Sequence, residues 1–600
     1  MANQYMSMRN LKFLFKDVHQ ASDLVNYEHF AHLDEESMEM MIDSSKQLAD
    51  TYLFPHYEDM DRNEPYLEDG EVKVHHSVKP YLDACAEAGL LGVAAPLEYG
   101  GMQIPSLLGT ALGFISSAAN NGVTGFSGLT NAAANVIVAF ATEEQKEYYL
   151  PKMFGGKWQG TMALTEPQAG SSLSDITSTA YPQPDGTYKI KGQKIYISAG
   201  DYTEAENVVH LYLARIEGAP KGTKGISLFI VPKYREENGE MVSNDVTVAG
   251  LYHKLGQKGT PACHIMAGEN DDCIGHLVGE AHRGLGYMFK MMNEARIGVG
   301  LGGSAVASAA YYASLEYAKE RPQGRKITNR DLNEPQTLII NHPDVQRMLL
   351  SQKAIVEGGL SLVMQAAKYA DLMDVSEGEE KENYHLLLEL LTPMVKTYPS
   401  EAGITSVSTG LQIFGGGGFC KDFPLENYYR DIRIYPIYEG TTGIQSQDLL
   451  GRKVTMKGGK AVQLFALEVG KAIEAAQTFE DLRPYAEKLG EEMQRMQKVI
   501  MHLIGFAMKG ELDKFLADAN LFMEMASLVT VGWQWLIQAT IAKQALLTEN
   551  PQGEEKAFLE SKVHTMKFFF HYEIPKTLGL SQRLMEKEWL TISSEAALVS

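Results

Sequence analysis

Apolar and polar positions follow two different periods along the chain, and the change between them divides the sequence into regions. Before about residue 160, apolar residues recur every three to four positions, as in residues 77–92 and 142–154. This spacing is typical of one buried helix face. The pattern therefore predicts an N-terminal helical domain over residues 1–160.

The pattern changes between residues 161 and 286. Residues 185–200 alternate β-branched or aromatic with polar side chains around a turn, and residues 206–216 and 225–233 are short apolar runs bounded by Gly, Pro or charge. Alternation and short bounded runs are typical of strands. We therefore expect a middle β domain, a barrel or sandwich, over residues 161–286.

Helical spacing returns after residue 286 and continues to the end of the chain. It predicts a helical-bundle domain over residues 287–455 and, beyond the linker-like residues 456–460, a C-terminal helical extension over residues 456–600. The acidic run at 376–383 is expected to form a solvated loop. The predicted fold class is therefore α+β and multidomain, in the order helical, β, helical, helical.

Length and charge narrow the possible functions. A chain of 600 residues is too long for one hydrophobic core. Its net charge of −22 repels phosphate backbones, so we expect no nucleic-acid partner. The uncharged stretch 525–542 contains two Gln and is interrupted by Gly532, which favours a buried helix over an integral membrane segment.

The cysteines indicate a reducing compartment. Only four occur in the chain, too few for a disulfide framework, so we predict a cytoplasmic protein. The spacing of Cys263, His264 and Cys273 fits no zinc pattern, and no metal site is predicted.

A glycine motif at residues 298–303 matches G-x-G-x-x-G. A dinucleotide-binding loop of this kind must follow a strand and open a helix. Here the residues on both sides have helical spacing. We therefore interpret these glycines as small residues that allow close helix packing.

Three further motifs each leave two interpretations open. The segment 162–172, MALTEPQAGSS, is either a polar turn or a ligand loop, and the segment 413–419, IFGGGGF, is either a helix C-terminus or a loop that holds a diphosphate. In the segment 435–445, Glu439 stands between an aromatic residue and a glycine at the expected start of a helix. Glu439 is either a helix-capping carboxylate or a general base with a pKa raised by desolvation.

Taken together, these motifs and their order resemble the acyl-CoA dehydrogenase family from about residue 80 to 455. The extension beyond residue 456 is similar to that of larger bacterial members, including 3-methylmercaptopropionyl-CoA dehydrogenases. The resemblance implies an FAD cofactor, an acyl-CoA substrate oxidised to a trans-2-enoyl-CoA, and an electron-transfer flavoprotein as electron acceptor. A homodimer is expected.

The resemblance also assigns roles to individual residues. It implies that Glu439 is the catalytic base. It implies FAD contacts at Met162, Leu164, Thr165, Gly170, Ser171, Tyr196, Ser198, Arg321, Gln412, Gly416 and Thr441. It implies substrate contacts at Ser171, Asn293, Arg296 and Gly440. Some family branches carry the base just before the arginine at 296, but Ala295 stands there, which leaves Glu439 as the matched candidate.

Three other functions fit the same scaffold. An acyl-CoA oxidase would pass electrons to oxygen. A DNA-binding flavoprotein of this fold is disfavoured by the net charge of −22. A non-catalytic acyl-CoA-binding scaffold is disfavoured by the presence of Glu439.

Overall fold

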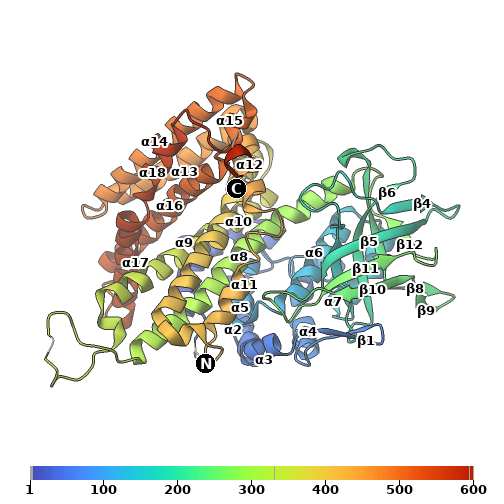
Figure 1. Cartoon of the computed structure of the whole chain (residues 1–600), viewed down its shortest axis with the longest axis horizontal. Helices are drawn as coiled ribbons and strands as arrows, with labels where there is room; N and C mark the ends of the chain where they lie inside the picture. Colours follow the sequence, from blue (N-terminus) through green and yellow to red (C-terminus); the bar gives the residue numbers. More distant parts are fainter. Residues whose placement is uncertain (1–3, 330, 593–594, 599–600) are drawn as a thin grey trace. The chain divides into compact units, whose positions relative to one another are not determined.

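The computed structural model describes residues 4–329, 331–592 and 595–598, except for the side chains of residues 289–293, 595 and 596. The chain forms two compact units (Figure 1). We call Met1–Asp34, Ser106–Phe114 and Arg296–Ser600 the helical unit, and Glu35–Pro105 with Ile115–Ala295 the β-containing unit.

The β-containing unit is built around an eight-stranded sheet. Its strands are β3 (Trp158–Ala163), β4 (Thr179–Pro182), β5 (Tyr188–Ser198), β6 (Asn207–Ile216), β7 (Ile226–Pro232), β10 (Val246–Leu251), β11 (Ala262–Ala267) and β12 (Ile274–Leu277). The order is β10-β11-β5-β12-β7-β6-β3, with β4 paired to β5 and β6. β7 and most of β6 are buried, as expected for central strands covered on both faces. The β part of the predicted fold class is thus confirmed.

The helices of this unit are α2 (Glu35–Leu48), α3 (Tyr57–Arg62), α4 (Val78–Glu87), α6 (Thr124–Phe140) and α7 (Glu143–Phe154). Of these, α6 and α7 contact the edge strand β3 of the sheet. α6 packs closely on β3, because a Cβ at Gly160 would lie 2.8 Å from the Ala133 side chain. α7 begins with a capping box in which Thr142 and Gln145 satisfy each other's backbone N–H groups.

Two short hairpins complete the β structure: β1 (Tyr66–Glu68) with β2 (Glu71–Lys73), and β8 (Tyr234–Glu237) with β9 (Glu240–Ser243). The first hairpin lies in the predicted N-terminal helical domain, where no strand was expected. Its turn is Asp69-Gly70, with φ of 51° and 81°. Asp-Gly is a favoured two-residue hairpin turn, so a local signal was present in the sequence.

The helical unit contains the bundle and the extension. Its helices are α1 (Met8–Lys12), α9 (Pro343–Val375), α10 (Gly378–Phe414), α11 (Leu425–Ile432), α12 (Thr442–Asp448), α13 (Lys460–Gln477), α14 (Arg483–Ala507), α15 (Leu512–Leu516), α16 (Ala519–Thr548), α17 (Gly553–Tyr572), α18 (Lys576–Leu584) and α19 (Glu595–Leu598). Two further helices, α5 (Ser106–Asn120) and α8 (Gly284–Glu320), carry residues assigned to both units. The helical domains of the predicted fold class are confirmed.

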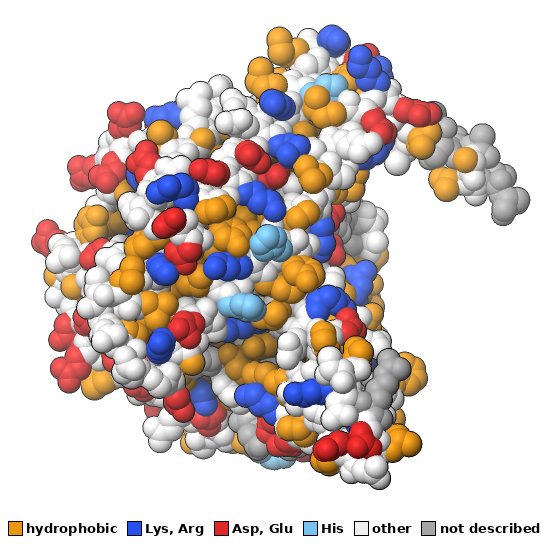
Figure 2. Space-filling model, turned by 90° about the vertical axis from the view of Figure 1, so that its left-hand side faces the viewer, with side chains coloured by type: hydrophobic (Ala, Val, Ile, Leu, Met, Phe, Trp, Pro, Cys, Tyr) orange, Lys and Arg blue, Asp and Glu red, His pale blue; other side chains and the backbone are white. Residues whose placement is uncertain are grey.

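The extension packs against α9 and α10. In α16, the indole Nε1 of Trp535 donates a hydrogen bond to Ala354 O of α9 (3.0 Å). The stretch 525–542 therefore forms the predicted buried helix. No helix among the described residues is both long enough and apolar enough to span a membrane. On the face shown in Figure 2, acidic and basic side chains are interspersed.

The glycines at 298–303 lie inside α8, where they allow close helix packing as predicted. A Cβ at Gly300 would lie 2.0 Å from Val395 O of α10, and one at Gly303 would lie 2.8 Å from Pro399 O. The acidic run at residues 376–383 was predicted to form a loop. This prediction is wrong, because α10 already begins at Gly378. Glutamates in a first helical turn are stabilised by the positive end of the helix dipole, so the run begins a helix.

Candidate active site

Glu439 lies in a strained turn between α11 and α12. Its φ is +53°, a conformation that residues other than glycine rarely adopt, and Gly440 follows with φ +90°. The Gln445 side chain holds the turn by donating from Nε2 to Glu439 O (3.2 Å). Backbone strain maintained in this way is frequent at functional sites.

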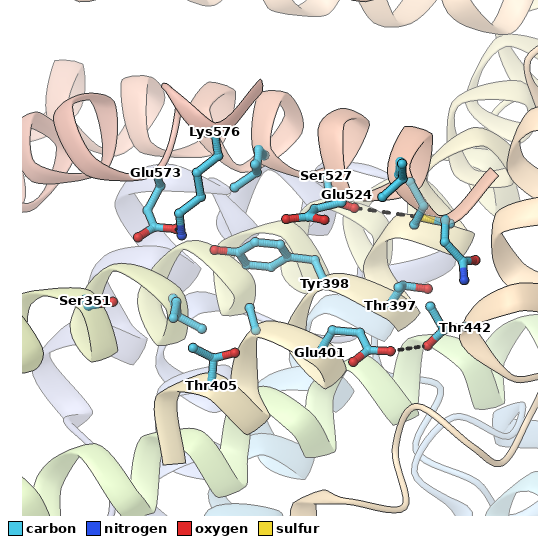
Figure 3. Close-up of a pocket in the computed structure, with 16 residues that line it drawn as sticks. Ser351, Thr397, Tyr398, Glu401, Thr405, Thr442, Glu524, Ser527, Glu573 and Lys576 are labelled. Carbon is cyan, nitrogen blue, oxygen red and sulfur yellow. Dashed lines mark hydrogen bonds and ion pairs between the residues drawn. The ribbon is translucent and has the colours of Figure 1, made fainter. Parts of the chain in front are cut away.

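The helix cap next to this turn is Thr441, not Glu439. The Thr441 Oγ1 accepts a hydrogen bond from Ile444 N (3.4 Å) at the start of α12. The next residue, Thr442, donates to a carboxylate oxygen of Glu401 on α10 (2.5 Å; Figure 3). The capping interpretation of Glu439 is therefore wrong, and its carboxylate is not used to begin the helix.

The Glu439 carboxyl is half-buried beside two cations. Burial raises its pKa above the ordinary value, and Arg296 and Lys396 oppose that rise. Arg296 is buried and lies 3.9 Å from Asp448 of α12. A carboxylate with a raised pKa is a stronger base than a solvated one, and it suits proton transfer near neutral pH.

Lys396 is a site residue that the sequence interpretation missed. It lies on α10 with no exposed surface, and its Nζ has no hydrogen-bond partner among the described residues. Burial lowers its pKa to about 8, while Glu401 and Glu439 act in the opposite direction. A single lysine within the apolar segment 390–398 was the available sequence signal.

The β-containing unit brings together the predicted flavin residues of two strands. After β3, the loop at 164–166 runs beside β5, where Thr165 O accepts from Ile195 N (2.9 Å). Tyr196 on β5 is 59% exposed and packs against Tyr252, with ring centroids 4.4 Å apart. The predicted set from this unit consists of Met162, Leu164, Thr165, Gly170, Ser171, Tyr196 and Ser198. Its exposed aromatic surface and its exposed backbone at Gly170 fit a flat ring ligand.

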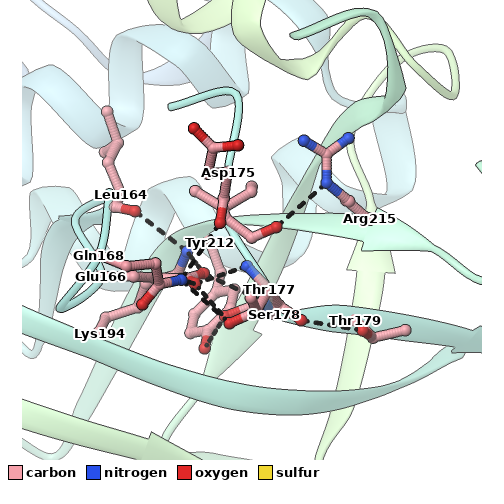
Figure 4. A network of polar contacts seen from close by, with 11 residues as sticks. Leu164, Glu166, Gln168, Asp175, Thr177, Ser178, Thr179, Lys194, Tyr212 and Arg215 are labelled. Carbon is pink, nitrogen blue, oxygen red and sulfur yellow. Dashed lines mark hydrogen bonds and ion pairs between the residues drawn. The ribbon is translucent and has the colours of Figure 1, made fainter. Parts of the chain in front are cut away.

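A buried ion pair holds the same loop (Figure 4). Glu166 and Lys194 are fully buried and 2.8 Å apart. The Glu166 carboxylate also accepts from Thr177 N (2.6 Å) and Ser178 N (3.1 Å). Burial alone would raise the pKa of Glu166, but Lys194 and these donors lower it to about 2. Lys194 Nζ also donates to Leu164 O (3.1 Å).

The remaining predicted residues lie near two helix ends of the helical unit. Arg321 follows α8, and Gln412 and Gly416 are exposed at the end of α10 and in the following 3₁₀ turn, Gly415–Phe419. Tyr317 of α8 stacks on Phe414 of α10 at 4.1 Å, which joins the two ends. In the segment 413–419, α10 ends at Phe414 and the four glycines with Phe419 form the turn, so a helix C-terminus is present and the diphosphate-loop interpretation stays a prediction. Asn293 lies outside the residues whose side chains are described.

Comparison with known proteins gives the family. The chain matches the N-terminal (residues 35–157), middle (161–268) and C-terminal (282–453) domains of acyl-CoA dehydrogenase, and residues 465–592 match a domain described as acetyl-CoA dehydrogenase C-terminal like. The chain belongs to the acyl-CoA dehydrogenase family. It is an FAD-dependent oxidoreductase that acts on acyl-CoA.

Individual relatives extend this likeness over nearly the whole chain. The 3-methylmercaptopropionyl-CoA dehydrogenase of Ruegeria pomeroyi is 38% identical over 84% of both chains. A broad-specificity linear acyl-CoA dehydrogenase of Mycobacterium tuberculosis is 32% identical over 96% of both. The solved acyl-CoA dehydrogenase of Bacillus anthracis in complex with FAD shares the fold, with a TM-score of 0.71, 22% identity and 93% coverage of each chain.

Proposed function

We propose that the chain dehydrogenates an acyl-CoA thioester to a trans-2-enoyl-CoA, and that Glu439 removes the α-proton. The observation that carries this proposal is the Glu439 turn, where a strained backbone presents a half-buried carboxylate with a raised pKa. Bound FAD supplies the acceptor for the β-hydride.

The same turn offers a donor to the thioester oxygen. The backbone N–H of Glu439 makes no hydrogen bond to any described residue, so it is available to a ligand. Removal of an α-proton places negative charge on that oxygen, and a preorganised donor of this kind is worth about 2.7–4 kcal/mol in comparable sites. One residue thus provides both the base and part of the charge stabilisation.

The resemblance also assigns further residues to the ligands in this proposal. The loop and strand set, Met162 to Ser198, would contact the flavin ring, with Ser171 also near the CoA chain. Thr441 would contact FAD in addition to capping α12. Gly440, Arg296 and Asn293 are proposed to contact the substrate.

We further propose a homodimer in which Arg321, Gln412 and Gly416 contact the FAD of the neighbouring subunit. Their exposure in the single chain supports this assignment. Sedimentation of the flavin-loaded protein tests this proposal. The wild-type protein should sediment as a dimer, and Arg321→Ala should dissociate the dimer and lose flavin. A monomer with full flavin content would contradict it.

We propose that the electrons leave to an electron-transfer flavoprotein. The two relatives named above are called dehydrogenases, which favours this acceptor over the oxygen of an oxidase. Hydrogen peroxide formed per turnover, measured with and without an electron-transfer flavoprotein, separates the two. Stoichiometric peroxide in air would establish the oxidase instead.

Bleaching of the oxidised flavin band by a panel of acyl-CoA esters tests the reaction itself. The wild-type protein should bleach with at least one ester. Glu439→Gln should keep its flavin and lose bleaching, because a general base contributes about 10²–10⁴-fold to the rate. Normal turnover by this variant would remove the assignment of Glu439.

A further inference from the structure

A groove of about 420 Å³ lies in the helical unit, where the C-terminal extension meets α9 and α10. Figure 3 shows its lining: Tyr398 and Glu401 come from α10, and Glu524 comes from α16. Glu573 and Lys576 close the side formed by α17 and α18. None of these residues is assigned to the flavin or the acyl-CoA, although Glu401 also accepts from Thr442 beside the Glu439 turn and interacts electrostatically with Lys396. The volume is typical of a small-molecule site.

The charge in the groove is unbalanced. Lys576 Nζ pairs with Glu573 at 2.5 Å, which neutralises one of the three glutamates. Glu401 accepts from the Thr442 hydroxyl, which carries no charge. Glu524 has no ion pair among the described residues. Two carboxylates therefore face the groove without a paired cation, an arrangement that repels phosphates and attracts cations.

Polar groups in the floor of the groove also lack partners. Tyr398 and Thr397 are only 7% and 4% exposed, and their hydroxyl oxygens have no hydrogen-bond partner among the described residues. Buried hydroxyls are nearly always hydrogen-bonded, so these two are available to hydrogen-bond a ligand in the groove. Figure 3 shows the Tyr398 ring among the three glutamates, with its hydroxyl turned toward Glu573 and Lys576. An aromatic ring beside carboxylates is a common surface for organic cations.

We propose that this groove binds a small organic cation that carries two or more primary or secondary ammonium groups on a short hydrocarbon chain. Glu524 and Glu401 take the ammonium groups, and Tyr398, Ile355 and Leu528 take the hydrocarbon. A metal ion is a poorer occupant, because no three His, Cys, Asp or Glu side chains within the described part of the chain are placed to hold one.

Titration calorimetry of the flavin-loaded full chain with putrescine and spermidine at physiological ionic strength tests the proposal. We expect saturable binding to one site, weakened about three- to fivefold by Glu524→Gln, because an exposed ion pair is worth up to about 1 kcal/mol. Lys576→Gln should tighten binding, since it removes the competing cation. Glu491→Gln on α14 has the same charge change on an exposed residue outside the groove and should have no effect.

Weaker binding by Glu524→Gln than by Glu491→Gln, which has the same change in net charge, would separate the groove from general attraction to an acidic protein. Absence of saturable binding, or equal binding by Glu524→Gln and Glu491→Gln, would overturn the proposal. The measurement needs no turnover, so it also works in Glu439→Gln. Failure here and failure of the proposed catalytic role can therefore be told apart.

Discussion

Glu166 in the β-containing unit is fully buried and Glu439 in the helical unit is half-buried, and their pKa values move in opposite directions. Glu166 accepts hydrogen bonds from Lys194, Thr177 and Ser178, and its pKa falls to about 2. Glu439 has cations nearby, but its carboxylate makes no hydrogen bond to the described side chains, and its pKa rises.

The comparison shows what separates a structural glutamate from a candidate base. Burial raises the pKa of both carboxyl groups, and hydrogen-bond donors to the carboxylate decide whether the net shift is upward or downward. With its donors in place, the Glu166 carboxylate stays ionised and fixes a loop. Without them, the Glu439 carboxylate keeps an affinity for protons and stays available to a ligand.

Removing one partner of the buried pair should produce the largest effect. Glu166→Gln leaves Lys194 buried without a counter-charge, which costs about 3–5 kcal/mol in the free energy of unfolding. Urea denaturation measures the loss. The double variant Glu166→Gln with Lys194→Met should recover much of it, and exposed Glu240→Gln is the matched control. A loss below about 1 kcal/mol would show that the pair contributes little.

Acid should weaken the same pair. The Glu166 pKa is lower in the folded chain than in the unfolded one, so its contribution to stability is present above the ordinary pKa. It is lost as the pH falls through the folded value of about 2. The shift corresponds to about 3 kcal/mol. The stability gap between wild type and Glu166→Gln should therefore narrow toward low pH, as denaturation at several pH values would show. A constant gap would contradict the assigned shift.

Lys396→Met should have a smaller effect, on Glu439, the proposed base. Removing this cation disfavours the carboxylate, so the pKa of Glu439 rises further and the base stays protonated to higher pH. The pH profile of the flavin-bleaching rate should shift toward alkaline pH. At pH values below the midpoint of the profile, the rate should fall several-fold. Lys396→Arg retains the charge and should stay close to wild type. Equal pH profiles for Lys396→Met and Lys396→Arg would show that the charge of Lys396 does not affect the pKa of Glu439. Arg296 would then be the cation that lowers that pKa.

The smallest expected effect concerns the cap beside Glu439. Thr441→Ala removes the acceptor for Ile444 N and should cost about 1 kcal/mol of stability, whereas Thr441→Ser retains it. Thermal unfolding compares the two. If Ser and Ala variants behave alike, the cap does not stabilise α12.

Much of the fold could be predicted from the sequence, because long amphipathic segments determine helices and bounded apolar runs determine strands. The β1–β2 hairpin was not predicted because each strand has only three residues and all three residues of β1 are exposed, which leaves no periodic signal. The acidic run at 376–383 was misread because its charges begin a helix.

The candidate site was predictable only in part. Glu439 stands in a motif that resembles a known family, but Lys396 lies 43 residues away in the chain and approaches it only through the fold. The pairing of Glu166 with Lys194 likewise depends on the loop at 164–166 lying beside β5. No local pattern indicates such contacts, because they depend on which elements pack together.

The most direct test of Glu439 as the base is exchange of the α-proton of a bound acyl-CoA with deuterated solvent. A thioester analogue that cannot be oxidised isolates this step from flavin reduction. The wild-type protein should exchange the α-proton, and Glu439→Gln should not, while both keep FAD. Exchange at the wild-type rate in Glu439→Gln would contradict the account.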